Sequence, residues 1–428
     1  MKLSPYWLDT LDPSDSSCLT AEVRPLPDSV DVAVVGGGYT GLAAARRLAM
    51  NGASVAVLER EHVGAGASSR NGGQVLTGLK IDGAALVASY GESKARALFE
   101  TAAHAIDTLE SVLDEEQISC EYERTGHLQA ACTPAHFAGF REEQDVLARV
   151  FHHRVELVPP AEQHAEIGSR AYHGVLVDPA SRGINPARYV AGLCAAARRR
   201  GACVAAQTPV TALARRGSGW IMVTPRGEIA ANDVLVATNG YTGPATPALQ
   251  RRFIPVGSYI VVTEPLSASD ASAVLPTRRM AFDSRHFLFY FRLTPDNRLL
   301  FGGRAEFSPS SPASTRRAGE ILRRGLAHVF PRLAGRSIDY VWSGNVAFTR
   351  DQLPRAGRLD GLYFAGGYGG HGIAMATYLG DTIARRMSGE AVSDPLLDDE
   401  MPPIPLYTGR PWFLPMVGAY YKVVDWLQ

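Results

Sequence analysis

The regular hydrophobic pattern of the chain begins at residue 31. An apolar run at 31–38 is followed by helical spacing at 39–52 and by a second apolar run at 53–59. Short apolar runs bounded by glycine are typical of buried parallel strands. The pattern predicts a strand–helix–strand unit, the building block of a parallel sheet with helices on its faces.

Similar pieces return in the middle and at the end of the chain, and strand-rich stretches lie between them. Helical spacing is found at 90–118, near 315–330 and at 372–387, and the turn at 295–297 predicts a hairpin. We therefore expect two domains that are interwoven in sequence. The expected ranges are a surface arm at 1–30, a first domain at 31–95, 170–250 and 346–390, a second domain at 96–169 and 251–345, and a tail at 391–428 packed on the body.

Length and charge exclude several classes of protein. The 428 residues predict two or three domains, and equal numbers of basic and acidic residues, 43 of each, give no basic field for nucleic acid. Five cysteines without a CxxC pair predict neither a disulfide framework nor a zinc site, and they fit a reducing compartment. We expect no metal, no signal peptide, no membrane span, a cytoplasmic location and a monomer or homodimer.

The first apolar run ends in the motif Gly36-x-Gly38-x-x-Gly41. In such a motif the first glycine makes the tight turn, the second admits a pyrophosphate and the third lets helix and strand pack closely. Glu59 ends the second apolar run, where a carboxylate accepts ribose hydroxyls, and Arg60 follows it rather than replacing it. The segment predicts a Rossmann-type dinucleotide site that disfavours a 2′-phosphate.

A second glycine motif, Gly367-x-Gly369-x-x-Gly372, follows an apolar run at 362–365. The helix after it leads into SGEAVSDPLLDDE, which has no second apolar strand ending in an acid. The late motif is therefore not a second nucleotide site. One fingerprint at the start and one glycine loop at the end suit a single dinucleotide that spans the molecule, and we expect FAD.

Several segments together resemble the FAD-dependent D-amino-acid oxidase/glycine oxidase superfamily. They are GGGYTGLAAARRLA, ASSRNGGQ at 67–74, VLVATNGYT at 234–242 and VAFTRDQLPRAGRLDGLYFAGGYGGHGIAMA at 346–376. RNGGQ, GGHG, the opening YWLDT and the closing RPWFLPMVGAYYKVVDW are most similar to the gamma-glutamylputrescine oxidoreductase branch. The resemblance implies an α/β fold in which a Rossmann-type FAD-binding domain is interwoven with a substrate domain built on a large mixed β-sheet.

The resemblance also implies which residues hold the cofactor. Glu59 would bind the adenosine ribose, Val210 would contact adenine through its backbone, and 369–373 would place a helix N-terminus at the flavin pyrimidine ring. That helix end would stabilise the negative charge of reduced flavin. The full set of expected FAD-binding residues is Gly36, Gly38, Tyr39, Thr40, Gly41, Glu59, Arg60, Ser68, Ser69, Arg70, Asn71, Gly72, Gly73, Gln74, Val210, Thr238, Asn239, Gly240, Gly367, Gly369, Gly370, His371, Gly372 and Ile373.

Departures from relatives refine these expectations. No cysteine follows Cys203, and Ser69-Arg70 stand where others have a flavin-linking histidine, so we expect non-covalent FAD. Some relatives hold a substrate carboxylate with a lysine where this chain has Ala374, which favours an amine over an amino acid. Arg304 is the alternative carboxylate partner.

For five candidate catalytic residues a purely structural role is the alternative. They are His371, Arg70, Tyr259, Tyr290 and Trp342, the aromatic three as a substrate cage or as core. Relatives often promote the reaction with oxygen through a lysine, but none lies between Lys94 and Lys422. We therefore expect the cation to be His371 or Arg70, or the electron acceptor to be something other than O2.

The expected function is FAD-dependent oxidation of a C–N bond in a small primary or secondary amine. Hydride transfer to flavin N5 would give an imine and then an aldehyde. The alternatives are an oxidase or dehydrogenase of D-amino acids, glycine or sarcosine, an electron-transfer subunit of a larger complex, and a catalytically silent flavin-binding module. The aromatic tail would pack on the body or, alternatively, touch a membrane or a partner.

Overall fold

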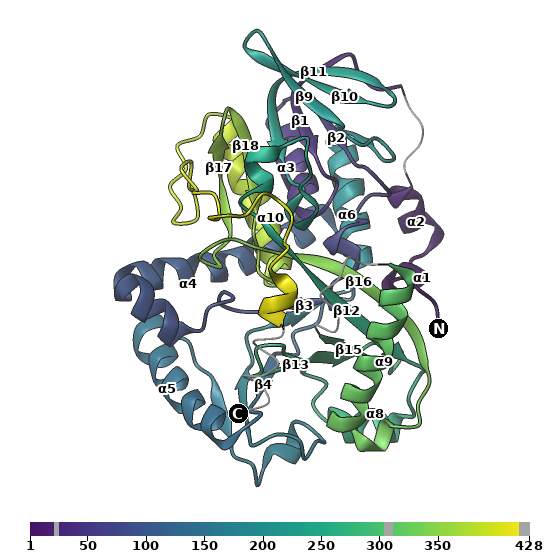
Figure 1. Cartoon of the computed structure of the whole chain (residues 1–428), viewed down its shortest axis with the longest axis vertical. Coiled ribbons are helices and arrows are strands. Elements are labelled where there is room, and N and C mark those ends of the chain that lie inside the picture. Colours follow the sequence, from purple (N-terminus) through teal and green to yellow (C-terminus); the bar gives the residue numbers. More distant parts are fainter. Residues whose placement is uncertain (21–24, 304–310, 419–428) are drawn as a thin grey trace.

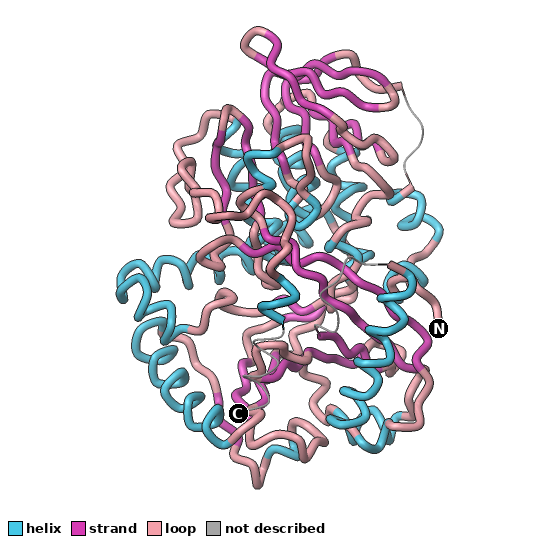
Figure 2. The backbone as a smooth tube through the Cα atoms, in the orientation of Figure 1, coloured by secondary structure: helices cyan, strands magenta, loops and turns pink. Residues whose placement is uncertain are grey.

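Two eight-stranded sheets organise the described chain, one in each half of the view in Figure 1. The computed structural model describes residues 1–20, 25–303 and 311–418. Figure 2 shows that helices gather beside both sheets and that loops connect the two halves. This arrangement is the mixed α/β fold that the sequence predicts.

The first sheet is built around β1 (Ser29–Val35), as the 31–59 pattern predicts. Its strand order is β17–β18–β11–β1–β2–β8, and β1 runs parallel to both β2 and β11. An antiparallel extension, β9–β10, continues from β11. The other strands are β2 (Val55–Leu58), β8 (Cys203–Ala205), β9 (Ala212–Arg216), β10 (Gly219–Thr224), β11 (Gly227–Val236), β17 (Arg355–Leu359) and β18 (Leu362–Gly366).

Three helices pack on this sheet through one large core. They are α3 (Tyr39–Met50), α6 (Pro186–Arg199) and α10 (Gly372–Met387), and Val34, Leu42 and Leu379 belong to the core that they share. A side chain at Gly380 would meet the backbone oxygen of Thr40 at 2.5 Å, so α10 and α3 approach closely. This packing brings the start of α10 beside the start of α3.

The second sheet is mixed, as expected for the substrate domain. Its order is β16–β12–β15–β14–β13–β4–β6–β5, in which β13 and β4 are parallel and their neighbours antiparallel. The hairpin predicted at 295–297 joins β14 to β15. The strands are β4 (His127–Ala130), β5 (Glu156–Val158), β6 (Val175–Asp178), β12 (Ile254–Thr263), β13 (Met280–Asp283), β14 (Tyr290–Leu293), β15 (Leu299–Gly303) and β16 (Ile338–Phe348).

Helices also cover the second sheet and join it to the first. The long helix α4 (Gly83–Glu116) is kinked at Gly91, whose φ of 74° is left-handed. It packs on α10 and on α5 (Pro134–Phe151). The remaining elements are α1 (Tyr6–Asp9), α2 (Pro13–Leu19), α7 (Pro247–Gln250), α8 (Ala268–Val274), α9 (Pro312–Val329), and the pair β3 (Gln74–Val75) and β7 (Arg182–Gly183).

The N-terminal arm corrects one expectation, because it does not only lie on the surface. Lys2 pairs with the edge of β16: its N–H donates to Asp339 O at 2.7 Å and its carbonyl accepts from Val341 N at 2.9 Å. The following helix α1 then buries Tyr6 and Trp7, and Trp7 is 0% exposed. Large aromatic side chains gain most from burial, so the arm inserts between the halves of the molecule.

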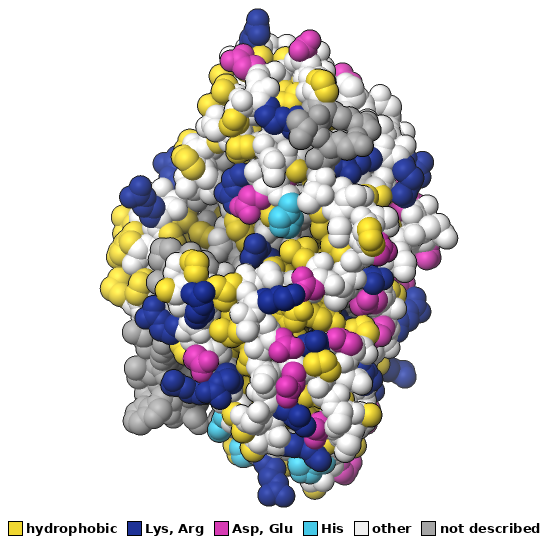
Figure 3. All heavy atoms as spheres, turned by 90° about the vertical axis from the view of Figure 1, so that its right-hand side faces the viewer, with side chains coloured by type: hydrophobic (Ala, Val, Ile, Leu, Met, Phe, Trp, Pro, Cys, Tyr) yellow, Lys and Arg dark blue, Asp and Glu magenta, His cyan; other side chains and the backbone are white. Residues whose placement is uncertain are grey.

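The C-terminal segment is partly packed. Leu396 is fully buried, and the Tyr407 hydroxyl donates to Phe253 O at 3.1 Å. Farther on, Trp412 and Met416 are exposed, and residues 419–428 lie outside the described chain. No helix within the described residues has the length and apolar character to cross a bilayer. On the face shown in Figure 3, basic and acidic side chains are interspersed.

Candidate active site

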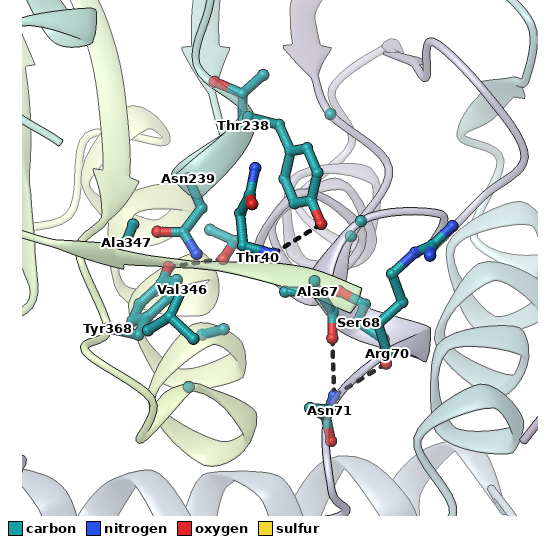
Figure 4. A pocket seen from close by; sticks show the side chains of 18 of the residues that line it. Thr40, Ala67, Ser68, Arg70, Asn71, Thr238, Asn239, Val346, Ala347 and Tyr368 are labelled. Atoms are coloured by element: carbon teal, nitrogen blue, oxygen red, sulfur yellow. Dashed lines mark hydrogen bonds between the residues drawn. The ribbon is translucent and has the colours of Figure 1, made fainter. Parts of the chain in front are cut away.

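A cavity of about 680 Å³ lies between the two sheets. Its wall takes Val35 and Val236 from the first sheet, Ser258, Tyr290 and Val346 from the second, and the loops that connect them. Figure 4 shows side chains from these separate segments meeting around one space. Cavities of this size bind cofactors and small ligands in other proteins.

The glycine motif shapes one end of the cavity. Gly36 has φ of 110°, and a Cβ there would lie 2.8 Å from Ala237 O. A Cβ on Gly38 would lie 2.8 Å from the Ser68 hydroxyl, and one on Gly41 would collide with Gly36 O. Gly38 provides no side-chain cap for α3, and the Tyr39 N–H donates to the Ser68 hydroxyl at 3.1 Å. The positive end of this helix borders the cavity, where it favours an anion.

Glu59 closes the same end. Its carboxylate accepts the N–H of Gly37 at 2.7 Å and the N–H of Glu61 at 3.0 Å. Arg60 is exposed and donates to Glu61 at 3.0 Å, while Val210 lies on the cavity wall nearby. The acid is therefore fixed by backbone donors beside the glycine turn, where the sequence predicts a ribose.

The loop 67–74 runs along the cavity and is held by its own polar side chains. Asn71 donates from Nδ2 to Ala67 O at 2.9 Å and to Ser68 O at 3.1 Å, and its Oδ1 accepts the Gly73 N–H at 2.9 Å. Two of these bonds are drawn in Figure 4. Gln74 lies on the wall, and its amide reaches two carbonyls of the second sheet.

Arg70 also lines the cavity, and protein carbonyls hold its guanidinium. Its Nε donates to Ala65 O at 2.7 Å and one terminal nitrogen donates to Ser343 O at 3.1 Å. These bonds leave the positive charge in place and fix its position. Arg70 therefore stays a candidate for electrostatic action rather than for proton transfer.

The other end of the cavity is formed by the late glycine loop. Gly369, Gly370 and Gly372 lie on the wall. The helix α10 begins there, and its N-cap residue, His371, makes no side-chain capping bond. The Nδ1 atom of His371 is shut off from solvent and has no partner among the described residues. A buried nitrogen without a partner marks a place for a ligand atom.

The protonation state of His371 corrects an expectation. Burial, reinforced by the positive charge of Lys80, lowers the pKa of His371 from 6.5 to about 3. The imidazole is therefore neutral at physiological pH. The lowered pKa counts against His371 as the cation expected to promote the reaction with oxygen.

Lys80 supplies a cation that the sequence-based expectation overlooked. Lys80 lies on the cavity wall, and a Cβ added to Gly369 would be 3.3 Å from the Cβ of Lys80. The expectation that no lysine serves the site considered only the chain after Lys94. Lys80 lies six residues after the loop 67–74, so its closeness in sequence to that loop was the signal available.

The aromatic candidates separate into two groups. Tyr290 lines the cavity, and its hydroxyl lies 3.1 Å from the hydroxyl of Ser258. Tyr259 and Trp342 are both 1% exposed and do not line it, and the Trp342 indole donates to Arg70 O at 2.9 Å. Of the three aromatic residues expected to form a substrate cage, only Tyr290 lies on the described cavity wall, because the other two side chains pack within the protein.

Most of the expected cofactor residues share this cavity. Gly41, Ser69, Gly73, Gly240 and Gly367 lie behind the wall rather than on it, and Arg304 is outside the described residues. The Ser69 hydroxyl, for example, turns away to Gly64 O at 2.8 Å. The expected residues on the wall are Gly36, Gly38, Tyr39, Thr40, Glu59, Arg60, Ser68, Arg70, Asn71, Gly72, Gln74, Val210, Thr238, Asn239, Gly369, Gly370, His371, Gly372 and Ile373.

The sequence did not single out several other wall residues. Tyr241 is one: its hydroxyl accepts the Asn345 N–H at 3.1 Å, which ties the loop after β11 to β16. Phe282, Phe287 and Leu288 form an apolar part of the wall in the second sheet and its loops. Only the position of Tyr241, directly after the expected contacts at 238–240, pointed to it.

These features fit a flavin dinucleotide. A glycine turn with an acid, two helix N-termini whose N-cap residues make no side-chain capping bond, and a buried nitrogen lacking a partner among the described residues all border one cavity. Tyr368 and Thr40 bridge the two helix ends through a 2.6 Å bond between their hydroxyls (Figure 4). A ligand with an anionic middle and a ring at its far end satisfies both helix ends at once.

Comparisons with known proteins find FAD-dependent oxidoreductases. A family model described as FAD dependent oxidoreductase matches residues 31–386. Gamma-glutamylputrescine oxidoreductase of Escherichia coli (strain K12) is 34% identical over 400 residues, which cover 92% of each chain. A probable oxidoreductase, OrdL, of Haemophilus influenzae is 31% identical over 85% of this chain and 84% of its own.

Solved structures show the same fold. Glycine oxidase from Geobacillus kaustophilus superposes with a TM-score of 0.71 at 22% identity, over 86% of this chain and 97% of its own. L-proline dehydrogenase from P. horikoshii superposes with a TM-score of 0.70 at 20% identity, over 87% of this chain and 96% of its own. With the family model spanning both sheets, the chain belongs to the DAO family of FAD-dependent oxidoreductases.

Proposed function

We propose that this enzyme oxidises the C–N bond of a small primary or secondary amine whose far end bears a carboxylate, as gamma-glutamylputrescine does. The charge of the cavity wall carries the proposal. Among the described wall residues the carboxylates are Glu59 and Glu61, both at the end of β2. The wall near the start of α10 instead carries Lys80 and His371.

This distribution favours a neutral amine at the reacting end. A carboxylate there would hold the substrate as an ammonium ion, which cannot give up hydride from the adjacent carbon. Neutral His371 and the aromatic rings of Phe282 and Tyr290 lower the polarity of the wall instead. The positive charge of Lys80 attracts a carboxylate and repels an ammonium ion, so it favours a substrate that carries an anionic group besides the neutral amine.

Bound flavin supplies the acceptor for the hydride that leaves the carbon next to the amine nitrogen. The chain orients the amine, excludes water with its apolar wall, and places the positive end of α10 where negative charge develops. The oxidised amine is an iminium, and water attacks its carbon and breaks the C–N bond, which gives an aldehyde and releases ammonia or a smaller amine. The electrons pass to O2 or to another acceptor.

An anaerobic panel of substrates tests the proposal. The loss of the oxidised flavin band would be followed with gamma-glutamylputrescine, putrescine, glycine, sarcosine and D-alanine. We expect the fastest bleaching with gamma-glutamylputrescine or a similar amine, and slow bleaching with the three amino acids. Faster bleaching by any of the amino acids would overturn the proposal and favour an amino-acid oxidase.

A further inference from the structure

Two tryptophans from distant parts of the chain hold neighbouring carbonyls of the loop 67–74. The indole N–H of Trp342, in β16, donates to Arg70 O at 2.9 Å. The indole N–H of Trp7, in α1, donates to Asn71 O at 2.9 Å. Both indoles are buried, with exposed fractions of 1% and 0%. Two successive peptide groups are thus held by two indoles that belong to one buried cluster.

Because the peptide group is planar and trans, the direction of its carbonyl also fixes the direction of its N–H. The N–H of residue i+1 lies opposite the carbonyl of residue i. With the carbonyls of Arg70 and Asn71 turned towards the indoles, the N–H groups of Asn71 and Gly72 are turned away from them. Arg70, Asn71 and Gly72 line the cavity, whereas neither tryptophan does. The two N–H groups therefore face the cavity.

Neither N–H has a protein acceptor within the described chain. The Gly73 N–H bonds to the side chain of Asn71, and the Arg70 N–H bonds to Ala67 O, but no bond is formed by the N–H of Asn71 or of Gly72. Gly72 is itself buried. Buried backbone donors are almost always paired, so this pair marks a ligand position.

The position along the cavity says which part of the cofactor is near. The glycine turn and Ser68 mark the end suited to phosphate, whereas a Cβ on Gly72 would lie 3.2 Å from the ring of Tyr290 in the second sheet. The two donors thus lie towards the second sheet. We propose that Trp7 and Trp342 act as positioning residues, which aim the N–H groups of Asn71 and Gly72 at an acceptor atom of the flavin ring.

Arg292, in β14, supports the same arrangement by binding a third carbonyl of the loop. It is 4% exposed and donates to Gly73 O at 2.8 Å and to Ile184 O at 3.1 Å. Its guanidinium lies 5.9 Å from the centre of the Trp7 ring. Carbonyls 70, 71 and 73 are thus each fixed by a side chain from outside the loop, and the N-terminal arm contributes one of the three.

Titration of the apoprotein with FAD and with ADP tests the proposal. Trp7→Phe and Trp342→Phe keep a buried ring and remove only the donor. We expect each to weaken FAD binding roughly three- to tenfold, the effect of one hydrogen bond, and to leave ADP binding unchanged. Trp220→Phe is the matched control, since Trp220 is buried in β10 and packs on Arg215 away from the loop.

Unchanged FAD affinity in both variants would overturn the proposal, and an equal loss of FAD and ADP affinity would place the donors at the phosphates instead. Hydrogen exchange of the wild-type protein decides the matter if a variant fails to fold. We expect FAD to slow exchange at the amides of Asn71 and Gly72 by at least about tenfold relative to the apoprotein. Exchange at these amides that is as fast with FAD as without it would also overturn the proposal.

Discussion

The carboxylate of Glu59 accepts the backbone N–H of Gly37 at 2.7 Å, so the acid that ends β2 is tied to the turn that follows β1. Glu59→Gln should weaken FAD binding by about 1–2 kcal/mol, because a hydrogen bond to a charged group is lost. Fluorescence titration of the apoprotein measures this. Glu100→Gln, which changes an exposed acid of α4 away from the cavity wall, is the control and should bind FAD normally. An unchanged affinity in Glu59→Gln would remove it as the ribose partner.

Replacing Gly38 by alanine should weaken FAD binding, whereas replacing Gly41 by alanine should lower the stability of the protein. At Gly38 the new Cβ would meet only the Ser68 hydroxyl, so the fold should survive while FAD binding weakens at least about tenfold. At Gly41 the Cβ meets backbone, so the protein itself should lose stability. Thermal denaturation and FAD titration of both variants separate the two effects. Equal melting temperatures for the two variants would contradict this distinction.

Lys80 offers a test of substrate charge. Lys80→Met keeps most of the side-chain length and removes the charge, so KM for gamma-glutamylputrescine should rise by about tenfold, equivalent to ~1.4 kcal/mol. The KM for putrescine, which has no carboxylate, should hardly change. Lys94→Met is the control, because Lys94 lies over the ring of Tyr90 on α4. If both substrates lost affinity equally, Lys80 would not bind the carboxylate.

His371 makes stability depend on pH. Its pKa is lowered to about 3 in the folded protein, so on acidification the unfolded chain takes up a proton first. Stability from this residue is present above about pH 6.5 and is lost as pH falls towards 3, by up to about 1.4 kcal/mol per pH unit. Denaturant unfolding of apo wild type and His371→Gln at about pH 7 and about pH 5 measures this.

The buried His127, with a pKa lowered by burial to about 4, changes stability in the same direction, so His371→Gln should remove only part of the slope. An identical loss of stability in both proteins would show that His371 is protonated equally in the folded and unfolded states.

The cofactor should be held without a covalent bond. The described cavity wall contains no cysteine, and Ser69 turns its hydroxyl away from it to Gly64 O. Acid or heat should therefore release all of the yellow colour as free FAD, measured by its fluorescence after the polypeptide is removed. Flavin fluorescence that stays with the denatured chain would contradict this, and His371 or His286, both on the wall, would then be examined first.

The sequence predicted the parts of the site that depend on local rules. A sequence pattern within a few residues predicts each of three features: the glycine motif, the acid after β2 and the start of α10. Tyr259 and Trp342 were misassigned because side chains of a strand alternate between two faces, and the sequence does not say which face meets the cavity. Trp7 and Lys80 were missed because their importance comes from contacts with segments far along the chain, such as Asn71 and Gly369.

The wall of the cavity begins at Val35 and is complete only with Ala376, so almost the whole described chain contributes to it. During synthesis the glycine turn after β1 leaves the ribosome early, whereas the start of α10, which completes the wall, leaves much later. Contacts between such distant segments form late in folding. The newly made polypeptide should therefore be released before it can hold its cofactor firmly. Cells short of riboflavin would then accumulate a folded but colourless form, open to proteases at the loops that the flavin would otherwise cover.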